Sequence, residues 1–304
     1  MINNNKLTPY WITGFSDGEA SFHASISKNE RYSLKYQIIP TFTIELKNCD
    51  IHLLYKIQEY FEGIGNISHI KNKGHSRYTV TKLQDLHEII IPHFNKYPLL
   101  TIKRINFLLF KKIVDILHTK VHLNYKDIQP LLNIRASMNK RSINKNIKTL
   151  YNIVPVDLPI LENLSALNIT SDWLIGFTDA EGCFFVNIRN NRNNNGYWVT
   201  PVYCLTQHSR DTVLFNIIKN FFGGGFITTS EENVVRFRTE NLNFIIEKII
   251  PMFKNTLQSK KALDFNDFCE ICMLLKKGAH LTNNGFEQIK IIKNRMNTKR
   301  TIYL

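Results

Sequence analysis

Alternating polar and apolar positions predict strands in the first half of the chain. Residues 37–46 place polar side chains mostly at odd positions and apolar side chains at even positions. Residues 21–29 repeat this period, with Phe22 and Ala24 on the apolar side, and residues 77–81 are predicted as another strand. Because successive side chains of a strand point to opposite faces, this period predicts strands with one apolar face and one face in water.

Helices are expected before and after these strands. Thr8-Pro9 and Ser171-Asp172 are helix start signals, and each precedes a tryptophan-containing segment that we interpret as a helix. Residues 83–93, 102–117 and 125–138 are also predicted as helices. The patterns therefore predict the order helix, four strands and then helices, with glycine segments that start hairpins. Antiparallel sheets of this kind have one polar face and one face covered by helices.

The sequence of the first half recurs in the second half. Residues 11–22, WITGFSDGEASF, return as residues 173–184, WLIGFTDAEGCF. Three further segments recur in the same order, and the offset drifts only from 162 to 158 residues. They are residues 61–67 with 221–227, 91–94 with 250–253, and 123–139 with 281–297. The chain is a tandem duplication, for which we expect units at 1–139 and 171–304 and a linker at 140–170.

The net charge narrows the class of partner. The 304 residues include 39 Lys and Arg against 25 Asp and Glu, which gives a formal charge of +14, and 43% are hydrophobic. A folded chain with this charge is expected to bind a polyanion. No apolar run approaches the roughly 18–20 residues that span a bilayer, and the N-terminus shows no secretory signal. Five cysteines, an odd number, indicate reduced thiols in an intracellular protein.

The solvent faces of the predicted sheets carry basic and amide side chains. Arg77 and Thr79 share one face of a strand, and Arg236 and Arg238 are their partners in the second repeat. A two-stranded ribbon fits the major groove of DNA, where such side chains read base edges, while lysines neutralise phosphates. We therefore expect double-stranded DNA as the partner. The predicted DNA contacts are His23, Ser25, Ser27, Asn29, Gln37, Thr41, Thr43, Glu45, Asn66, Ser68, Arg77, Thr79, Thr81, Cys183, Phe185, Asn187, Arg189, Asn191, Thr200, Val202, Cys204, Thr206, Phe226, Thr228, Arg236 and Arg238.

Each repeat begins with a helix that has small residues four positions apart. Gly14 and Gly18 in the first helix correspond to Gly176 and Ala180 in the second. Small residues at this spacing let two helix backbones approach closely. We therefore expect the two helices side by side about a pseudo-twofold axis, with equivalent residues brought together.

A glutamate directly follows the last small residue of each helix. Two carboxylates at adjacent helix C-termini, Glu19 and Glu181, repel each other unless a cation lies there. Magnesium takes oxygen ligands, and the last-turn carbonyls of Gly18 and Ala180 could add to the carboxylates. Such metal sites support in-line displacement at phosphorus. The aspartates just before the small residues are expected to act as caps or hydrogen-bond acceptors.

These helices resemble a known motif. Residues 12–20, ITGFSDGEA, and 174–182, LIGFTDAEG, are similar to the nine-residue motif that names the LAGLIDADG homing endonucleases. A chain of this length with two motifs resembles the single-chain, pseudo-dimeric branch of that family. The resemblance implies an α+β fold of two αββαββα units, whose two antiparallel sheets form a saddle on DNA. It also implies a monomer that cleaves both strands across the minor groove of a long target and leaves short 3′ overhangs.

The resemblance assigns roles to particular residues. The acid in the eighth motif position, here Glu19 and Glu181, would bind divalent metal, and the preceding residue would contribute its carbonyl. The metal is expected to be Mg²⁺, with Ca²⁺ or Mn²⁺ as a substitute in crystals. Lys103 and Lys261 fit the lysines that family members place near the scissile phosphates. A metal-activated water would attack each strand, so no nucleophilic side chain is required.

Gln207 resembles a polar residue that helps to place the metal-bound water. Leu46 occupies the corresponding position in the first half, so we expect the two strands to be cleaved at unequal rates. The resemblance, together with abundant Ile and Asn that suggest an AT-rich coding sequence, indicates an intron-encoded mitochondrial protein.

Three functions from different classes fit these features. They are a magnesium-dependent DNA endonuclease, an intron maturase that binds RNA as a splicing cofactor, and a duplicated DNA-binding protein without chemistry. Glutamates retained in both halves favour the endonuclease, because a protein that only binds DNA gains nothing from acids beside phosphates. Maturase activity can coexist with nuclease residues in this family, so intron RNA remains a second candidate partner.

Overall fold

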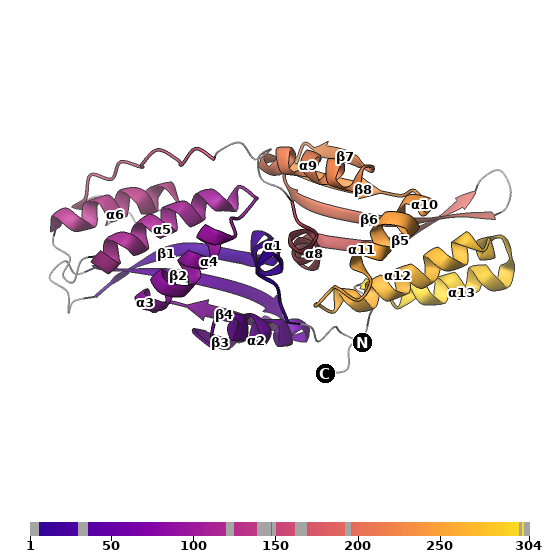
Figure 1. Cartoon of the computed structure of the whole chain (residues 1–304), viewed down its shortest axis with the longest axis horizontal. Helices are drawn as coiled ribbons and strands as arrows, with labels where there is room; N and C mark the ends of the chain where they lie inside the picture. Colours follow the sequence, from indigo (N-terminus) through magenta and orange to yellow (C-terminus); the bar gives the residue numbers. More distant parts are fainter. Residues whose placement is uncertain are drawn as a thin grey trace. The chain divides into compact units, whose positions relative to one another are not determined.

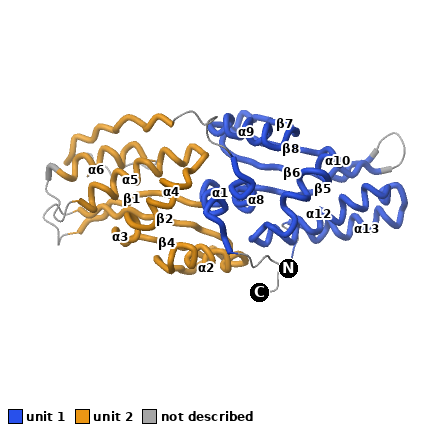
Figure 2. Tube along the Cα trace, viewed as in Figure 1, with its two compact units in different colours: residues 1–18, 167–304 blue, residues 19–166 orange. Residues whose placement is uncertain are grey.

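The protein folds into two compact units, which Figure 2 distinguishes by colour. The computed structural model describes residues 6–29, 36–119, 125–138, 147, 150–161, 169–191, 196–297 and 300. One unit comprises residues 19–166, and the other comprises residues 1–18 together with 167–304. The first helix of the chain therefore belongs to the same compact unit as the second repeat, and the repeat boundaries at 139 and 171 remain a prediction.

The unit of residues 19–166 is a four-stranded antiparallel sheet covered by helices (Figure 1). The sheet has the order β1-β2-β4-β3. Its strands are β1 (Ala20–Lys28), β2 (Tyr36–Lys47), β3 (Asn66–Ile70) and β4 (His75–Val80). Its helical elements are η1 (Asn48–Asp50), α2 (Ile51–Tyr60), α3 (Leu83–Asp85), the π-helical η2 (Leu86–Ile90), α4 (Ile91–Lys96), α5 (Lys103–Thr119) and α6 (Tyr125–Ser137).

The other unit repeats this plan and adds a pair of helices at its start. Its sheet has the order β5-β6-β8-β7. The paired helices are α1 (Pro9–Glu19) and α8 (Ser171–Glu181), and the strands are β5 (Gly182–Asn191), β6 (Gly196–His208), β7 (Phe226–Ser230) and β8 (Val234–Thr239). The remaining helical elements are η4 (Ser209–Asp211), α9 (Thr212–Phe222), α10 (Leu242–Phe244), the π-helical η5 (Ile245–Ile249), α11 (Ile250–Phe253), α12 (Lys261–Lys276), η6 (Ala279–Leu281) and α13 (Asn283–Asn294).

Aromatic clusters join each sheet to its helices. Phe22 of β1 lies against Phe42 of β2, Phe94 of α4 and Phe107 of α5, with ring centroids 5.1–5.3 Å apart. In the second unit the equivalent Phe184 has partners on β6, α11 and α12 at 4.9–5.7 Å. Burial of such large apolar side chains between sheet and helices drives the packing, and it leaves the opposite sheet face to solvent.

The predicted α+β class and the αββαββα order are confirmed, whereas the element order read from periodicity alone was incomplete. It missed α2 and its counterpart α9, which separate the strand pairs in each sheet. Leu53, Leu54 and Ile57 of α2 are fully buried at helical spacing. The glycine segments end these helices with positive φ at Gly63 (76°) and Gly223 (72°) and lead into the hairpins.

The helix α8 begins at Ser171, as the predicted start signal indicates, and the residue before it caps the helix. Thr170 is the N-cap, and its side chain accepts a hydrogen bond from the backbone N–H of Trp173. Thr8 makes the same contact with Trp11 in the first repeat, at 3.3 Å. A threonine oxygen thus satisfies one of the free N–H groups at the beginning of each helix.

The described part of the predicted linker lies along α6. Ser137 donates to the carbonyl of Val156 at 2.7 Å, and Gln129 donates to the carbonyl of Asn152 at 2.6 Å. The other residues of 140–170, apart from Ile147, 150–161 and 169–170, lie outside the described residues. Among the helices that the structure describes, none has the length and apolar character that a bilayer span requires.

Candidate active site and nucleic-acid interface

The backbones of α1 and α8 are in direct contact (Figure 1). A Cβ atom on Gly14 would lie 2.0 Å from the carbonyl oxygen of Trp173. The reverse contact is equivalent, because a Cβ on Gly176 would lie 2.1 Å from the carbonyl oxygen of Trp11. No packed interior accommodates such overlap, so glycine is required at both positions. The close helix pair expected from the sequence is confirmed, and its contacts are reciprocal.

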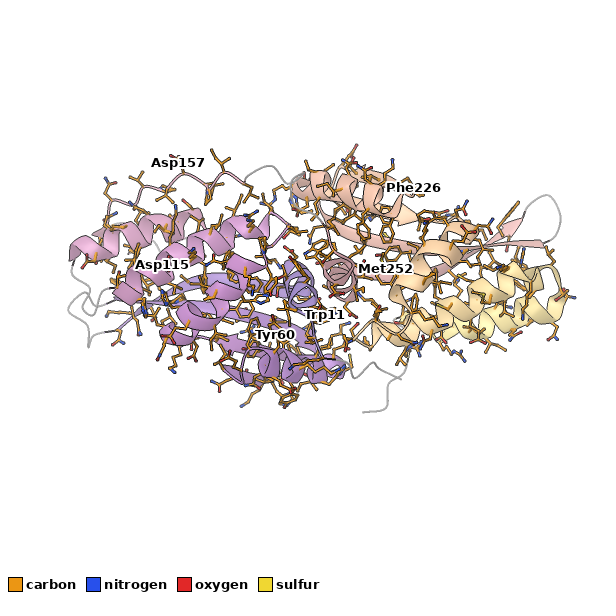
Figure 3. All side chains as sticks on the ribbon, viewed as in Figure 1. Trp11, Tyr60, Asp115, Asp157, Phe226 and Met252 are labelled. Atoms are coloured by element: carbon orange, nitrogen blue, oxygen red, sulfur yellow. The ribbon has the colours of Figure 1, made fainter. Side chains whose placement is uncertain are left out.

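Buried indole–carboxylate hydrogen bonds join the two helices. Trp11, labelled in Figure 3, donates its Nε1–H to Asp179 at 3.0 Å, and Trp173 donates to Asp17 at 2.8 Å. Both aspartates are therefore hydrogen-bond acceptors, as expected from the sequence. Each is a buried hydrogen bond between residues more than 150 positions apart in the sequence, so these two contacts hold the helices in register.

Asp179 also fixes the segment that leads into α12. Its carboxylate accepts hydrogen bonds from the backbone N–H groups of Gln258 (2.9 Å) and Ser259 (3.0 Å) and from the Ser259 hydroxyl (2.6 Å). Burial raises the pKa of Asp179, and the hydrogen bonds from Ser259 and Gln258 oppose that rise. The motif helix thereby positions the first residue of α12, Lys261.

Lys261 contacts the C-terminal end of α8. Its Nζ donates to the carbonyl oxygens of Thr178 (2.9 Å) and Ala180 (3.1 Å). A cation at this helix end is favoured by the helix dipole. Lys103 begins α5 in the same way that Lys261 begins α12, since their backbone N–H groups donate to Thr101 (3.3 Å) and Ser259 (3.2 Å).

The ends of the paired helices hold the candidate metal ligands. A Cβ on Gly18 would lie 2.3 Å from the Cβ of Ala180 and 3.4 Å from Oε1 of Glu181. Glu181 is the last residue of α8 and is half-buried, as is Glu19 at the end of α1. Within the described residues, no group of three or more His, Cys, Asp or Glu side chains is arranged to hold a metal ion.

Strand register places the predicted DNA contacts of each half on one sheet face. Thr43 pairs with Ser21 on one side and Thr79 on the other, and Arg77 pairs with Glu45 and Ser68. The second sheet follows the same register. This face lies opposite the phenylalanine clusters, as the two-residue period predicts.

Three of these positions are buried. Val202 is 0% exposed, and Thr41 and Cys204 are 7% and 8% exposed. We leave Val202 out of the proposed interface, because an aliphatic side chain without exposed surface cannot contact a base. The side chain of Asn191, the last residue of β5, lies outside the described residues.

Gln207 lies on the other face of its strand. Its register partner Val235 is fully buried in the core, and its own Oε1 accepts the backbone N–H of His208 at 3.0 Å. Gln207 is thus near the end of β6 and does not share the face of the predicted DNA contacts.

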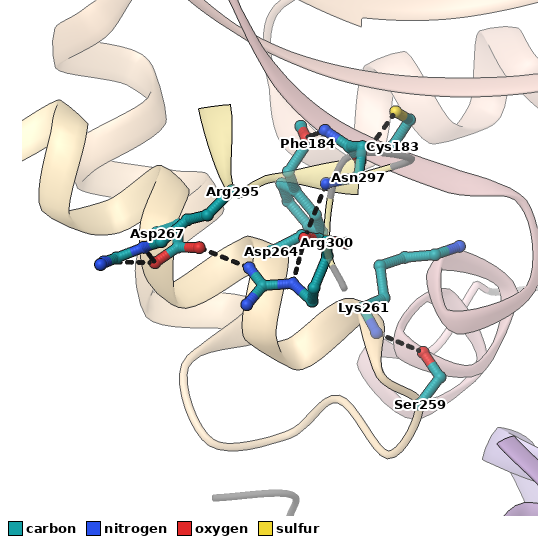
Figure 4. Close-up of polar contacts among 9 residues, drawn as sticks. All are labelled: Cys183, Phe184, Ser259, Lys261, Asp264, Asp267, Arg295, Asn297 and Arg300. Atoms are coloured by element: carbon teal, nitrogen blue, oxygen red, sulfur yellow. Dashed lines mark hydrogen bonds and ion pairs between the residues drawn. The ribbon is translucent and has the colours of Figure 1, made fainter. Parts of the chain in front are cut away.

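Two ion-pair networks were not predicted from the sequence. In the first, Glu45 accepts hydrogen bonds from Arg77 and His75 on the solvent face of the first sheet. In the second, Asp264 of α12 accepts from Arg300 and from the backbone of Asn297, both at 2.9 Å (Figure 4). The second network anchors the segment after α13 to α12, the helix that starts with Lys261. Both depend on pairing between distant segments, which periodicity does not reveal.

Comparison with known proteins identifies the family. The sequence model described as LAGLIDADG endonuclease matches residues 12–114 and 174–272, one copy for each repeat. A probable intron-encoded endonuclease 2 of Neurospora crassa is 34% identical over 299 residues, which are 95% of this chain and 65% of that protein. This chain belongs to the LAGLIDADG endonuclease family. An uncharacterized mitochondrial protein RF1 of Saccharomyces cerevisiae is 24% identical over 98% of this chain and 62% of its own length. The chain thus spans less than two thirds of either relative.

A solved member of the family has the same fold. The I-SmaMI LAGLIDADG homing endonuclease bound to cleaved DNA matches with a TM-score of 0.93 and 30% identity over 98% of this chain and 100% of that one. I-SmaMI bound to an uncleaved DNA target in the presence of calcium ions matches with a TM-score of 0.89 and 29% identity, over 96% and 99% of the two chains. The similarity extends over both repeats.

Proposed function

We propose that this chain is a site-specific homing endonuclease that binds double-stranded DNA as a monomer and hydrolyses both strands with a divalent metal. The observation that carries the proposal is the α1–α8 pair, in which two family motifs are held together by reciprocal contacts and each ends in a glutamate. The similarity to I-SmaMI bound to cleaved DNA supports the same reaction.

The residues at the helix ends fit magnesium. Carboxylate and carbonyl oxygens are the donors that Mg²⁺ and Ca²⁺ prefer. The carbonyl of Ala180 already attracts a cation, since Lys261 Nζ lies 3.1 Å away. A Cβ on Gly18 would overlap the Cβ of Ala180 at 2.3 Å, so glycine at this position lets the two helix ends, and the glutamates that follow, approach each other. We therefore propose the carboxylates of Glu19 and Glu181 and the carbonyls of Gly18 and Ala180 as ligands. The calcium in the I-SmaMI structure supports a divalent ion.

A bound metal would supply an activated water and stabilise the leaving 3′ oxygen. The chain's own contribution is to orient the phosphate and balance its charge. Asp179 and Ser259 hold Lys261 at the end of α8, where its ammonium would face a phosphate. Lys103 is proposed for the same role in the first half, and Gln207 for orienting the water.

The solvent faces of the two sheets are proposed to contact the DNA. Their Arg, Asn, Thr and Ser side chains can read base edges, and the net charge of +14 favours the phosphate backbone. A mitochondrial location is proposed from the name of the yeast relative and from the intron-encoded Neurospora relative. Binding of intron RNA remains a prediction, which a binding assay with the host intron transcript would test.

The test begins with the full chain and a random-sequence duplex DNA pool. Bound duplexes are selected in Ca²⁺, sequenced, and incubated with the protein in Mg²⁺ or in EDTA. We expect one long target, cleaved on both strands only with Mg²⁺. A protein that selects a target and never cuts it in Mg²⁺ is a binding protein, and the proposal is then wrong.

Substitution of the proposed ligands tests the site itself. Because loss of even an outer-shell partner lowers metal-dependent activity about 10- to 100-fold, Glu19→Gln or Glu181→Gln should lower double-strand cleavage more than about 100-fold while sparing DNA binding. Glu88→Gln and Glu247→Gln change the charge equally at exposed, repeat-equivalent positions and serve as controls. Full cleavage by either ligand variant contradicts the shared site.

A further inference from the structure

Glu45 is the only acid among the predicted DNA contacts, and both of its oxygens are engaged. Oε2 accepts hydrogen bonds from Arg77 Nε (3.1 Å) and Arg77 Nη2 (2.6 Å), and Oε1 accepts from His75 Nδ1 (3.1 Å). The hydrogen bonds from Arg77 hold the pKa of Glu45 below its usual value, so it is ionised at neutral pH. A bare carboxylate on a face that meets phosphates is unfavourable, and here the charge of Arg77 offsets it while His75 adds a hydrogen bond.

The network fixes the direction of the Arg77 side chain. Arg77 and Glu45 are direct register partners on adjacent strands, and Ser68 flanks Arg77 on the other side. The guanidinium has five N–H donors, and the contact with Glu45 needs only Nε and one hydrogen of Nη2. The Arg77 side chain keeps 42% of its surface exposed. Donors therefore remain for a partner in solvent.

Stability alone is a weak reason for this network. Exposed ion pairs contribute little to folding, since solvent screens them and ordering two long side chains costs entropy. Recognition gives a stronger reason. An unrestrained arginine beside DNA can turn to any phosphate, whereas one held by a carboxylate presents its remaining edge in one direction.

The matching position of the second sheet lacks this restraint. Thr206 takes the place of Glu45 opposite Arg236, and Thr228 lies on the other side of Arg236. The two halves thus offer an arginine at the same register position, restrained by a carboxylate in one half and flanked by hydroxyls in the other.

We propose that Glu45 is a positioning residue that holds Arg77 for a bidentate contact with a guanine in the half-site read by the β1-β2-β4-β3 sheet. This inference rests on the proposed DNA recognition. Guanine presents two acceptors, O6 and N7, to an arginine in the major groove, and no other base presents that pair. The half-site read by the first sheet therefore has a more stringent position than its counterpart read through Arg236.

The test uses the random-sequence duplex pool with the full chain and three variants. Arg77→Lys keeps the charge and loses the bidentate fork, so it should lower guanine preference at one position about 10- to 100-fold. Glu45→Gln should lower guanine preference at that same position about tenfold and leave the other positions unchanged. Thr206→Ala is the matched change in the second half and should leave the guanine preference at the Arg77 position unchanged. Thermal unfolding of each variant checks the fold.

The outcomes separate the inference from the proposed function. If the unmodified protein selects no consensus sequence, DNA recognition itself is wrong and the inference with it. If a consensus appears but Glu45→Gln and Arg77→Lys do not act on one shared guanine, the inference alone is wrong. A Glu45→Gln variant that weakens every position of both half-sites equally also overturns it, because that result marks a general loss of structure.

Discussion

The two halves of this protein share an aromatic cluster and differ at several positions around it. The clusters around Phe22 and Phe184 have the same partners in the same elements. By contrast, Thr206 of the second half occupies the position that corresponds to Glu45 of the first, and Gln207 occupies the one that corresponds to Leu46. The aromatic cluster must preserve volume and shape to keep the fold, whereas a solvent-facing position such as that of Glu45 can change without loss of packing. A duplicated fold can therefore read a target whose two half-sites differ.

The helix pair is where the halves are most alike. Trp11 stacks on Phe15 and Trp173 on Phe177, each with ring centroids 4.8 Å apart. The indole hydrogen bonds and the glycine contacts are reciprocal as well. Equivalence is required here because each helix is the packing surface of the other. Substitutions at these equal positions should act alike in both halves, whereas those at the unequal positions should not.

Substitution of either contact glycine should have the largest effect on stability. Gly14→Ala and Gly176→Ala each put a Cβ within about 2 Å of a backbone oxygen, which the helices can relieve only by moving apart. We expect each change to lower the free energy of unfolding by at least about 3 kcal/mol, measured by urea denaturation.

Two further glycines provide controls. Gly63→Asn and Gly223→Asn introduce a side chain at φ values of 76° and 72° where the space is open. Because asparagine tolerates this conformation, each should cost less than about 1 kcal/mol. Unequal losses for Gly14→Ala and Gly176→Ala would break the equivalence of the two helices.

The free energy of unfolding should depend on pH in the acid range because of a histidine in the first half. The buried ring of His93 shares a hydrogen bond of 3.1 Å with the Tyr60 hydroxyl, and burial lowers the pKa of His93 to about 3. Met252 occupies the same position in the second repeat. Between pH 6.5 and 3 the unfolded chain binds a proton that the folded chain does not. The free energy of unfolding therefore falls as the pH drops below about 6.5. At pH 5 the contribution of His93 to this loss is about 2 kcal/mol.

Urea denaturation at pH 7 and pH 5 checks this prediction. His93→Met should reduce the difference between the two pH values by about 2 kcal/mol, whatever its effect at pH 7. The reverse exchange, Met252→His, should increase it if the second pocket buries the ring equally. An unchanged difference in His93→Met would show that acid sensitivity originates elsewhere.

Unequal strand cleavage is the smallest expected effect. With Gln207 in one half and Leu46 in the other, the two strands should be nicked at rates that differ about three- to tenfold, equivalent to about 0.6–1.4 kcal/mol. Supercoiled plasmid carrying the selected target should pass through a nicked form, and Gln207→Leu should bring the two rates together. Equal nicking of both strands by the unmodified protein contradicts the proposed role of Gln207.

Much of the architecture could be predicted from local patterns. The period of two assigned the sheet faces, because side-chain alternation is a property of each strand and needs no tertiary information. The repeat revealed the duplication, and the small residues of the motif predicted the helix contact at Gly14 and Gly176. The periodicity did not predict α2 and α9, because these short helices lie between strands whose alternating pattern is the stronger local signal.

The sequence by itself determined the duplication, the polar faces and the candidate acids at the helix ends. Only the tertiary structure decided which groups meet. The ammonium group of Lys261 donates to the carbonyls of Thr178 and Ala180, which lie 83 and 81 residues earlier in the sequence. The carboxylate of Asp179 accepts the backbone N–H of Ser259, which lies 80 residues later. It also decided that Arg77 is restrained by Glu45. Such contacts depend on how distant segments pack, and packing is fixed by the shape of the whole core rather than by any local pattern.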